Sequence, residues 1–300
     1  FGSFSATLKP FKWISFSSTN TLTLTNVNRN DYLDSRTYGG NHSRNEMSNG
    51  VLQVDDERSW TFLTSNILRL QHSFGDHNLN GIVGQEWYER HTRSSHVEMY
   101  DQIIAGERNV GGFSKQGDKT NPGVIPTGAE RESASFSVFS EVNYNYAGKY
   151  MASASFRTDG STNFGKDNRY GTFYSFSGSW LISRENFMAR QDVVSNLKLR
   201  MSYGTSGKEA GMDYLNYTLY STSNTTFDYY RNHPAYQSAY GATINQLGND
   251  QLSWETAYNL NVGVDVALLD NRISLSADWY KRRNSDLIMS TTLPAAKGVG

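Results

Sequence analysis

Residues 258–268 read YNLNVGVDVAL, an unbroken alternation of apolar and polar side chains. Successive side chains of a β-strand point to opposite faces, so this stretch predicts a strand with one apolar face and one small polar face. After the turn Leu269–Arg272 the alternation resumes over 273–280. The two segments predict an antiparallel hairpin whose apolar faces are shared.

Alternation alone fits two architectures. In a soluble β-sandwich the apolar face packs on a second sheet, whereas in an outer-membrane barrel it faces lipid and the polar face lines the lumen. Ser175, Ser177 and Ser179 on one polar face favour the barrel. Aromatic residues near the predicted strand ends also favour it, because two aromatic girdles mark the membrane interfaces. The girdle candidates are Tyr144, Tyr146 and Tyr150 at one end, and Trp60, Trp87, Tyr88, Trp254, Tyr258 and Trp279 at the other.

The composition of the chain excludes several classes of protein function. The formal net charge is -1 and the sequence pI about 6.7, which gives no electrostatic basis for binding nucleic acid. No apolar run approaches the roughly 20 residues of a transmembrane helix. Cysteine is absent, which excludes a disulfide framework and thiolate chemistry. Aromatic residues make up 13% of the chain, a proportion suited to many strands.

The connections between the predicted strands differ in length. We expect about ten strands, joined by tight turns at Lys9–Phe11, Gly75–His77, Ala147–Gly148 and Asp270–Asn271. Longer connections alternate with these turns, as the short periplasmic turns and long outer loops of outer-membrane barrels do. The predicted strands are 1–8, 12–33, 58–74, 78–90, 133–146, 149–158, 169–182, 196–206, 254–268 and 272–288, and the predicted long extracellular loops lie near 34–57, 91–132 and 207–253.

Several long strings resemble the barrel of SusC-type (SusC/RagA) TonB-dependent outer-membrane transporters of Bacteroidetes. These strings occupy 74–87, 149–172, 179–189, 195–208, 252–289 and 293–300. The chain departs from the family pattern at Lys208-Glu209, where Asn-Gln is common, and at Tyr174, where Pro is common.

The resemblance implies an all-β, antiparallel transmembrane barrel of about 22 strands. Residues 1–300 would form part of that one domain. The plug domain, the TonB-contacting segment and the terminal strands would lie outside this chain, and the location would be the outer membrane of a Gram-negative bacterium. The implied function is TonB-dependent import of a bulky polar nutrient, an oligosaccharide or a peptide, under a SusD-like surface lipoprotein acting as a lid.

The implied partners are therefore the lipoprotein, TonB, the nutrient and the lipid bilayer, with no cofactor and no enzymatic reaction. A lone TonB-dependent receptor or a passive porin-like barrel remains the alternative. An outer-membrane hydrolase would need Ser, His and carboxylate side chains placed together, and all the histidines lie in or beside predicted loops and turns. We therefore predict no catalytic residue.

Aromatic, amide and hydroxyl side chains are concentrated in the predicted loop 207–253. Rings and amides of this kind suit stacking and hydrogen bonding to sugars or peptides. The rings could instead pack within the loop or form the seat of the lipoprotein. The candidate substrate-binding residues are Tyr214, Tyr229, Tyr230, Arg231, Tyr236 and Tyr240.

Other motifs have simpler interpretations. The string Asp159–Gly165 resembles a calcium loop but has Phe164 where such a loop needs Gly, so we interpret it as an outer turn. His91 and His96 have no tight ligand set beside them and are interpreted as solvated, and no metal site is predicted. On the polar face of the hairpin, Asp265 is expected to tolerate replacement by Asn.

Overall fold

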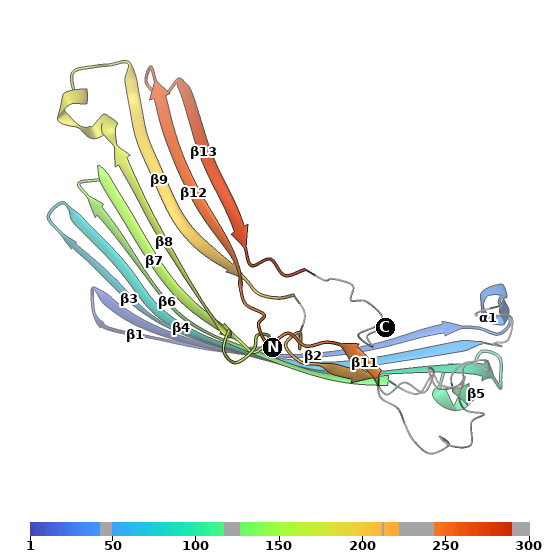
Figure 1. Ribbon diagram of the computed structural model, residues 1–300. Helices are drawn as coiled ribbons and strands as arrows, with labels where there is room; N and C mark the ends of the chain where they lie inside the picture. Colours follow the sequence, from blue (N-terminus) through green and yellow to red (C-terminus); the bar gives the residue numbers. More distant parts are fainter. Residues whose placement is uncertain (43–49, 117–126, 212, 222–242, 290–300) are drawn as a thin grey trace.

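The computed structural model describes residues 1–42, 50–116, 127–211, 213–221 and 243–289 (Figure 1). Within this part of the chain, ten long antiparallel strands form one continuous, curved sheet. The strands are β1 (Gly2–Phe11), β2 (Ile14–Leu33), β3 (Val51–Phe74), β4 (His77–Gln102), β6 (Thr127–Tyr146), β7 (Tyr150–Ser161), β8 (Tyr170–Leu181), β9 (Val194–Lys208), β12 (Glu255–Leu268) and β13 (Ile273–Ser285). The all-β, antiparallel prediction of about ten strands is confirmed.

Each long strand pairs with the next long strand along the chain. Short turns gather at one end of the sheet, and the longer connections gather at the other (Figure 1). The turn between β6 and β7 is tight because Ala147 and Gly148 adopt left-handed backbone, with φ of 53° and 64°. At the end with the longer connections lie helix α1 (Tyr38–His42), the short strand β5 (Phe113–Gln116) and the small hairpin of β10 (Leu219–Ser221) and β11 (Thr243–Gln246).

The two faces of the sheet differ in chemistry, as the alternation predicts. Exposed large apolar side chains project from the face that carries Val262 and Val264, called here the outer face. Val83 is 51% exposed, Phe156 51% and Met201 55%. Apolar surface of this extent needs a non-aqueous neighbour. The opposite, inner face carries mainly serine, threonine, asparagine and charged side chains.

An aromatic row crosses the sheet at the turn end. Ring centroids lie 4.7 Å apart between His77 and Tyr146, 6.3 Å between Tyr146 and Tyr150, and 6.2 Å between Tyr150 and Trp180. Tyr144 continues this row, with its hydroxyl 2.6 Å from His77 Nδ1. The predicted aromatic cluster beside this turn is therefore present.

The second predicted girdle is only partly correct. Trp60, Trp87, Tyr258 and Trp279 alternate onto the outer face, as expected. Two other members were assigned to the wrong face. Tyr88 falls on the inner face, because it is one residue out of phase with Trp87. The ring of Trp254 packs on Phe164 and Phe173, at centroid distances of 5.0 and 5.8 Å, on the inner side.

Strands β3, β4 and β6 extend further than the sequence predicts. Strand β3 begins at Val51 rather than 58, and β4 continues to Gln102 rather than ending at 90. The apolar alternation is interrupted over 55–59 and 89–96, where polar residues occupy both faces, whereas backbone pairing continues through these stretches. The outer side of this extension is covered by a small apolar core, formed by Leu52, Met99 and Phe113 with Tyr32, Val54 and Val97 around it.

The first turn is also shifted from its predicted position. It lies at Lys12–Trp13, and Pro10 remains within β1, where the pairing register breaks between Leu8 and Phe11. Proline has no N–H to donate and is tolerated at such a break. No helix in the described ranges is long and apolar enough to cross a membrane.

Candidate functional site

The inner face forms a polar wall along the strands. Across β1 and β2, Ser3 bonds to Thr21 and Ser5 to Thr19, each at 3.1 Å between hydroxyl oxygens. Further along the same inner face, between β7 and β8, Ser155 Oγ lies 2.6 Å from Ser175 Oγ. Hydroxyl groups both donate and accept hydrogen bonds, so this wall can exchange bonds with water or with a polar molecule passing it.

Arg157 stands at the centre of one charged group on the wall. Its Nε donates to Asp159 at 2.6 Å and its Nη2 to Ser137 Oγ at 3.0 Å. Nη2 also lies 3.6 Å from Glu86 Oε2, and the guanidinium sits 5.3 Å from the Phe139 ring centroid. The carboxylates and the ring hold the guanidinium against strands β4, β6 and β7.

Arg200 forms a second charged group on β9, β12 and β13. Nε and Nη2 donate to the two carboxylate oxygens of Asp265 at 2.7 and 2.9 Å, and Nη1 lies 3.3 Å from Asp278 Oδ1. Ser276 donates to Asp265 Oδ1 at 2.7 Å. This network revises the expected tolerance of Asp265→Asn, since an amide would offer Arg200 one acceptor and no charge.

Neither arginine was singled out from the sequence. Both occupy inner-face positions within strands, each beside another charged residue on the same face: Asp159 for Arg157, and Lys198 for Arg200. Their partners lie on neighbouring strands or at the next inner position of the same strand, so a single-strand pattern shows the cation but not the whole network. The sequence feature that could have identified each site is an arginine at an inner-face position of a predicted strand.

At its loop end, the sheet carries a compact group of packed side chains on its inner side, called here the loop anchor. The Phe164 side chain is fully buried, with 0% exposure, against Trp254. Glu209 accepts hydrogen bonds from the Ser161 hydroxyl and, at 3.0 Å, from Asn163 Nδ2. The family departure at Glu209 therefore has a structural role, because it ties the end of β9 to the segment after β7. The calcium-loop residues are engaged in protein hydrogen bonds, which supports their interpretation as structural.

Of the predicted ligand-contacting residues, the structure describes Tyr214 alone. Its hydroxyl accepts a hydrogen bond from the backbone N–H of Glu132 at 2.7 Å, and its carbonyl accepts one from Gln246 at 2.9 Å. Its ring centroid lies 6.3 Å from that of Tyr217. Tyr214 thus fastens the loop to β6. The remaining candidates, Tyr229, Tyr230, Arg231, Tyr236 and Tyr240, lie outside the described residues.

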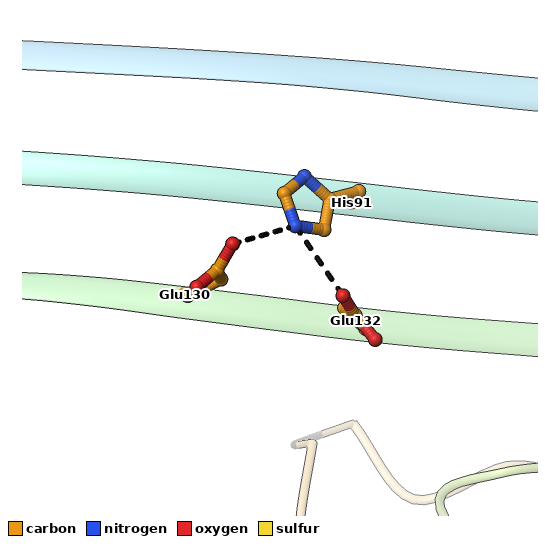
Figure 2. A group of neighbouring side chains, drawn as sticks. All are labelled: His91, Glu130 and Glu132. Atoms are coloured by element: carbon orange, nitrogen blue, oxygen red, sulfur yellow. Dashed lines mark hydrogen bonds and ion pairs between the residues drawn. The ribbon is translucent and has the colours of Figure 1, made fainter.

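Both loop-side histidines have carboxylate partners, which corrects their interpretation as solvated. Figure 2 shows His91 Nε2 facing Glu130 at 3.0 Å and Glu132 at 3.4 Å, across β4 and β6. The possible ligand atoms of these three residues all lie within 4.8 Å of one another, but both glutamates are exposed and an ordinary ion pair accounts for the arrangement. The group lies on the outer face, away from the polar wall.

His96 lies on the inner face of the strand extension, with Nδ1 2.5 Å from Asp55 Oδ1. This hydrogen bond, with a smaller contribution from Gln53, lowers the pKa of the Asp55 carboxyl below its ordinary value. The Asp55 carboxylate is thereby kept ionised, at a position on the loop side of the predicted aromatic girdle.

At the turn end, Glu185 connects three segments. Its carboxylate accepts hydrogen bonds from Trp180 Nε1 at 3.1 Å and from Lys149 Nζ at 3.2 Å. The pKa of Glu185 is lowered, chiefly by a hydrogen bond from Tyr150 and then by those from Trp180 and Lys149. Residues 179–189 therefore hold the connection after β8 against the turn at Ala147–Gly148.

Comparison with known proteins gives consistent results. A family model described as TonB dependent receptor-like, beta-barrel, matches residues 3–299. TonB-dependent receptor P3 of Formosa agariphila is 32% identical over 240 residues, which is 79% of this chain and 22% of that protein. TonB-dependent receptor SusC of Bacteroides thetaiotaomicron is 35% identical over 159 residues, 53% of this chain and 16% of that protein.

A solved structure of the RagAB peptide transporter superposes on 99% of this chain with a TM-score of 0.81 and 24% identity, and 31% of that chain is covered. At this identity the likeness concerns the fold. The chain thus spans less than a third of the length of these relatives. Its sheet, its apolar outer face and its match to the family model agree in placing it in an outer-membrane barrel. The chain belongs to the TonB-dependent receptor β-barrel family, as a segment of the barrel wall that is similar in sequence to SusC.

Proposed function

We propose that the full-length protein containing this chain imports a bulky polar nutrient, an oligosaccharide or a peptide, across the outer membrane in a TonB-dependent manner. The observation that carries the proposal is the polar inner wall on a barrel segment of this family. Its hydroxyl ladder and the Arg157 and Arg200 groups offer hydrogen bonds and charge to a hydrated solute.

We further propose a SusD-like surface lipoprotein as the lid, and the segments 34–57, 91–132 and 207–253, which include the loop-side ends of β3, β4 and β6, as the extracellular side. The similarity to SusC and the likeness in fold to the RagAB peptide transporter support this arrangement. RagAB is described as a transporter of peptides, which keeps peptides beside oligosaccharides as candidates here.

Gentle detergent purification of the tagged full-length protein tests the lid. We expect a lipoprotein to co-purify, since a stable complex buries above about 1,000 Å². A matched variant deletes part of 222–242 and keeps Tyr214, Gln246 and Glu209, so that the loop anchor is preserved. We expect this variant to retain less lipoprotein than the parent.

A lone TonB-dependent receptor and a passive porin-like barrel give different results. A full-length protein that never carries a lipoprotein would favour the lone receptor. Uptake of the nutrient that continues after removal of TonB would favour the passive barrel and overturn energised import. In cells, uptake that depends on both TonB and the lipoprotein is the expected result.

A further inference from the structure

The outer face of β9, β12 and β13 contains an open groove of about 500 Å³ near the loop end of the sheet, and β13 is the last strand of the described sheet. The groove lies beyond Trp279, which is 58% exposed and faces outward. The lining residues are Tyr203, Tyr258, Leu260, Lys281, Arg283 and Ser285.

Strand register explains how the groove combines rings and cations. Tyr203, Leu260 and Lys281 form one row across the three strands. In the next row toward the loops, Tyr258 lies beside Arg283. Each cation therefore lies next to an apolar or aromatic side chain. Lys281 is one row, and Arg283 two rows, closer to the loops than the apolar row of Met201, Val262 and Trp279. Long basic side chains at such a level place their stems on apolar surface and their charged ends in the headgroup region.

The groove carries a net positive charge. Among the residues that the structure describes, Lys281 and Arg283 make no side-chain hydrogen bond or ion pair, whereas Arg157 and Arg200 are fully engaged. The acidic residues of β12 and β13, namely Glu255, Asp265 and Asp278, fall on the inner face. Asp286, just after β13, accepts a hydrogen bond from the groove residue Ser285 at 3.0 Å, so one carboxylate stands beside two cations. Strands β8 and β9 contain no acidic residue.

This pattern is specific to one part of the outer face. In the region of Trp60 and Trp87, the outward positions mix cations with carboxylates: Arg58 and Arg93 stand beside Asp56, Glu130 and Glu132. An anionic group would meet carboxylates as well as cations there, and chiefly cations at the β12–β13 groove. The difference points to an anionic ligand for the groove.

We propose that this groove binds the phosphorylated headgroup of an outer-leaflet lipid. The phosphate sits between Lys281 and Arg283, the sugar or glycerol part lies against Tyr203 and Tyr258, and an acyl chain follows Leu260 along the apolar wall. Charge complementarity selects phosphate, and continuity with the lipid-facing wall selects a lipid over free phosphate. Because long loops face the cell exterior in barrels of this kind, the outer leaflet is the source. The site is independent of nutrient import.

The test uses the full-length protein in a zwitterionic detergent with purified phosphorylated lipid A as the probe. Binding is measured by native mass spectrometry and by the lipid-dependent rise in Tm. We compare the double variant Lys281→Gln/Arg283→Gln with Arg282→Gln, whose residue lies between the other two in sequence but on the opposite face. We expect the double variant to bind about thirtyfold more weakly, from about 1 kcal/mol per cation. Arg282→Gln should bind like the parent.

Two further measurements distinguish a lipid-borne phosphate from free phosphate. Dephosphorylated lipid A should bind more weakly than lipid A, and inorganic phosphate alone should not raise Tm. Equal binding of both lipids, an equal effect of Arg282→Gln, or a response to phosphate alone would overturn the proposal. Folding is checked by the shift in gel mobility on heating. If the double variant does not fold, the single variants Lys281→Gln and Arg283→Gln replace it, and unchanged lipid binding in both would overturn the proposal.

Discussion

Arg200 lies across the backbone of Gly263 and donates two hydrogen bonds to Asp265. In the register of β9 and β12, Arg200 pairs with Gly263, and Asp265 is the next inner-face residue, so the bond is diagonal. A Cβ at position 263 would stand 2.9 Å from Arg200 Nη2 and 2.4 Å from Asp278 Oδ1. The glycine thus provides the space in which the cation meets both carboxylates.

Gly263→Ala is expected to destabilise the barrel by displacing this cation. The added methyl group would overpack the site, at a cost of about 1–3 kcal/mol. Gly178→Ala is the matched control, because a Cβ there meets its nearest atom, Met151 O, at 3.8 Å. Urea unfolding of the full-length protein in lipid vesicles measures both variants. Equal stability of the two would contradict the role given to Gly263.

Val264→Arg tests the assignment of the faces. Val264 points outward in the middle of β12, and an arginine near the bilayer midplane costs about 2–4 kcal/mol. Asn261→Arg places the same side chain on the inner face, where water can solvate it, and should cost much less. Folding yield and urea unfolding in vesicles provide the comparison. Similar destabilisation in both variants would show that the faces are misassigned.

Glu185→Gln is expected to weaken the turn end in a pH-dependent way. The folded state lowers the pKa of Glu185 from its ordinary value of 4.5, so the carboxylate stabilises the fold above that pH. This contribution is lost as the pH falls through the lowered pKa. The difference in unfolding free energy between parent and variant should therefore be present at pH 7 and shrink below about pH 4.5.

The control for that experiment is Glu57→Gln, at an exposed position on the inner face. It should leave unfolding at pH 7 close to that of the parent. A Glu185→Gln variant whose deficit stays constant from pH 7 to pH 3 would argue for a packing effect without a role for the charge.

Phe164→Ala is expected to release the loop anchor. Removing a fully buried phenylalanine costs about 3–5 kcal/mol, and here the cost falls on the packing against Trp254. Limited proteolysis should cut between 209 and 254 faster in this variant, with the barrel intact. Phe187→Ala, at a residue that is 67% exposed, serves as the control. Unchanged proteolysis would mean that the loop is held elsewhere.

Replacement of Tyr229, Tyr230 and Tyr236 together by Ala tests the ligand-binding prediction for the loop. Removing each ring that stacks on the ligand should cost about 0.5–1.5 kcal/mol of binding free energy. The triple Phe variant retains the rings and should bind nearly as well as the parent. Calorimetry on the full-length complex, with panels of oligosaccharides and peptides, supplies the measurement. Equal affinity of all three proteins would remove these tyrosines from the binding site.

The sequence alone determined the all-β class, because one period-two pattern repeats through nearly the whole chain. Residues 258–268 specify which side chains share a face, and the turn at 269–272 specifies a hairpin. The strings at 149–172 and 252–289 additionally indicated the family. These properties are local in the chain, and local pattern is sufficient to specify them.

Strand limits and the faces of some residues required the tertiary structure. The extension of β4 to Gln102 is held by backbone pairing with β3, with β6 and, at Gln102, with β5, beyond a stretch at 89–96 that is polar on both faces. The inward packing of Trp254 depends on Phe164, which is distant from it in the sequence. Tyr214 was chosen for its ring, yet the structure uses its hydroxyl to hold Glu132.

The charged groups of the inner wall belong to the tertiary structure for the same reason. Arg200 and Asp278 are distant in sequence and meet only because β9, β12 and β13 are neighbours in one register. The free cations of the outer groove, Lys281 and Arg283, likewise stand out only when the acids of the same strands are seen to face inward. Composition and periodicity fix which face a residue occupies, whereas its partners across the sheet are fixed by strand order and register.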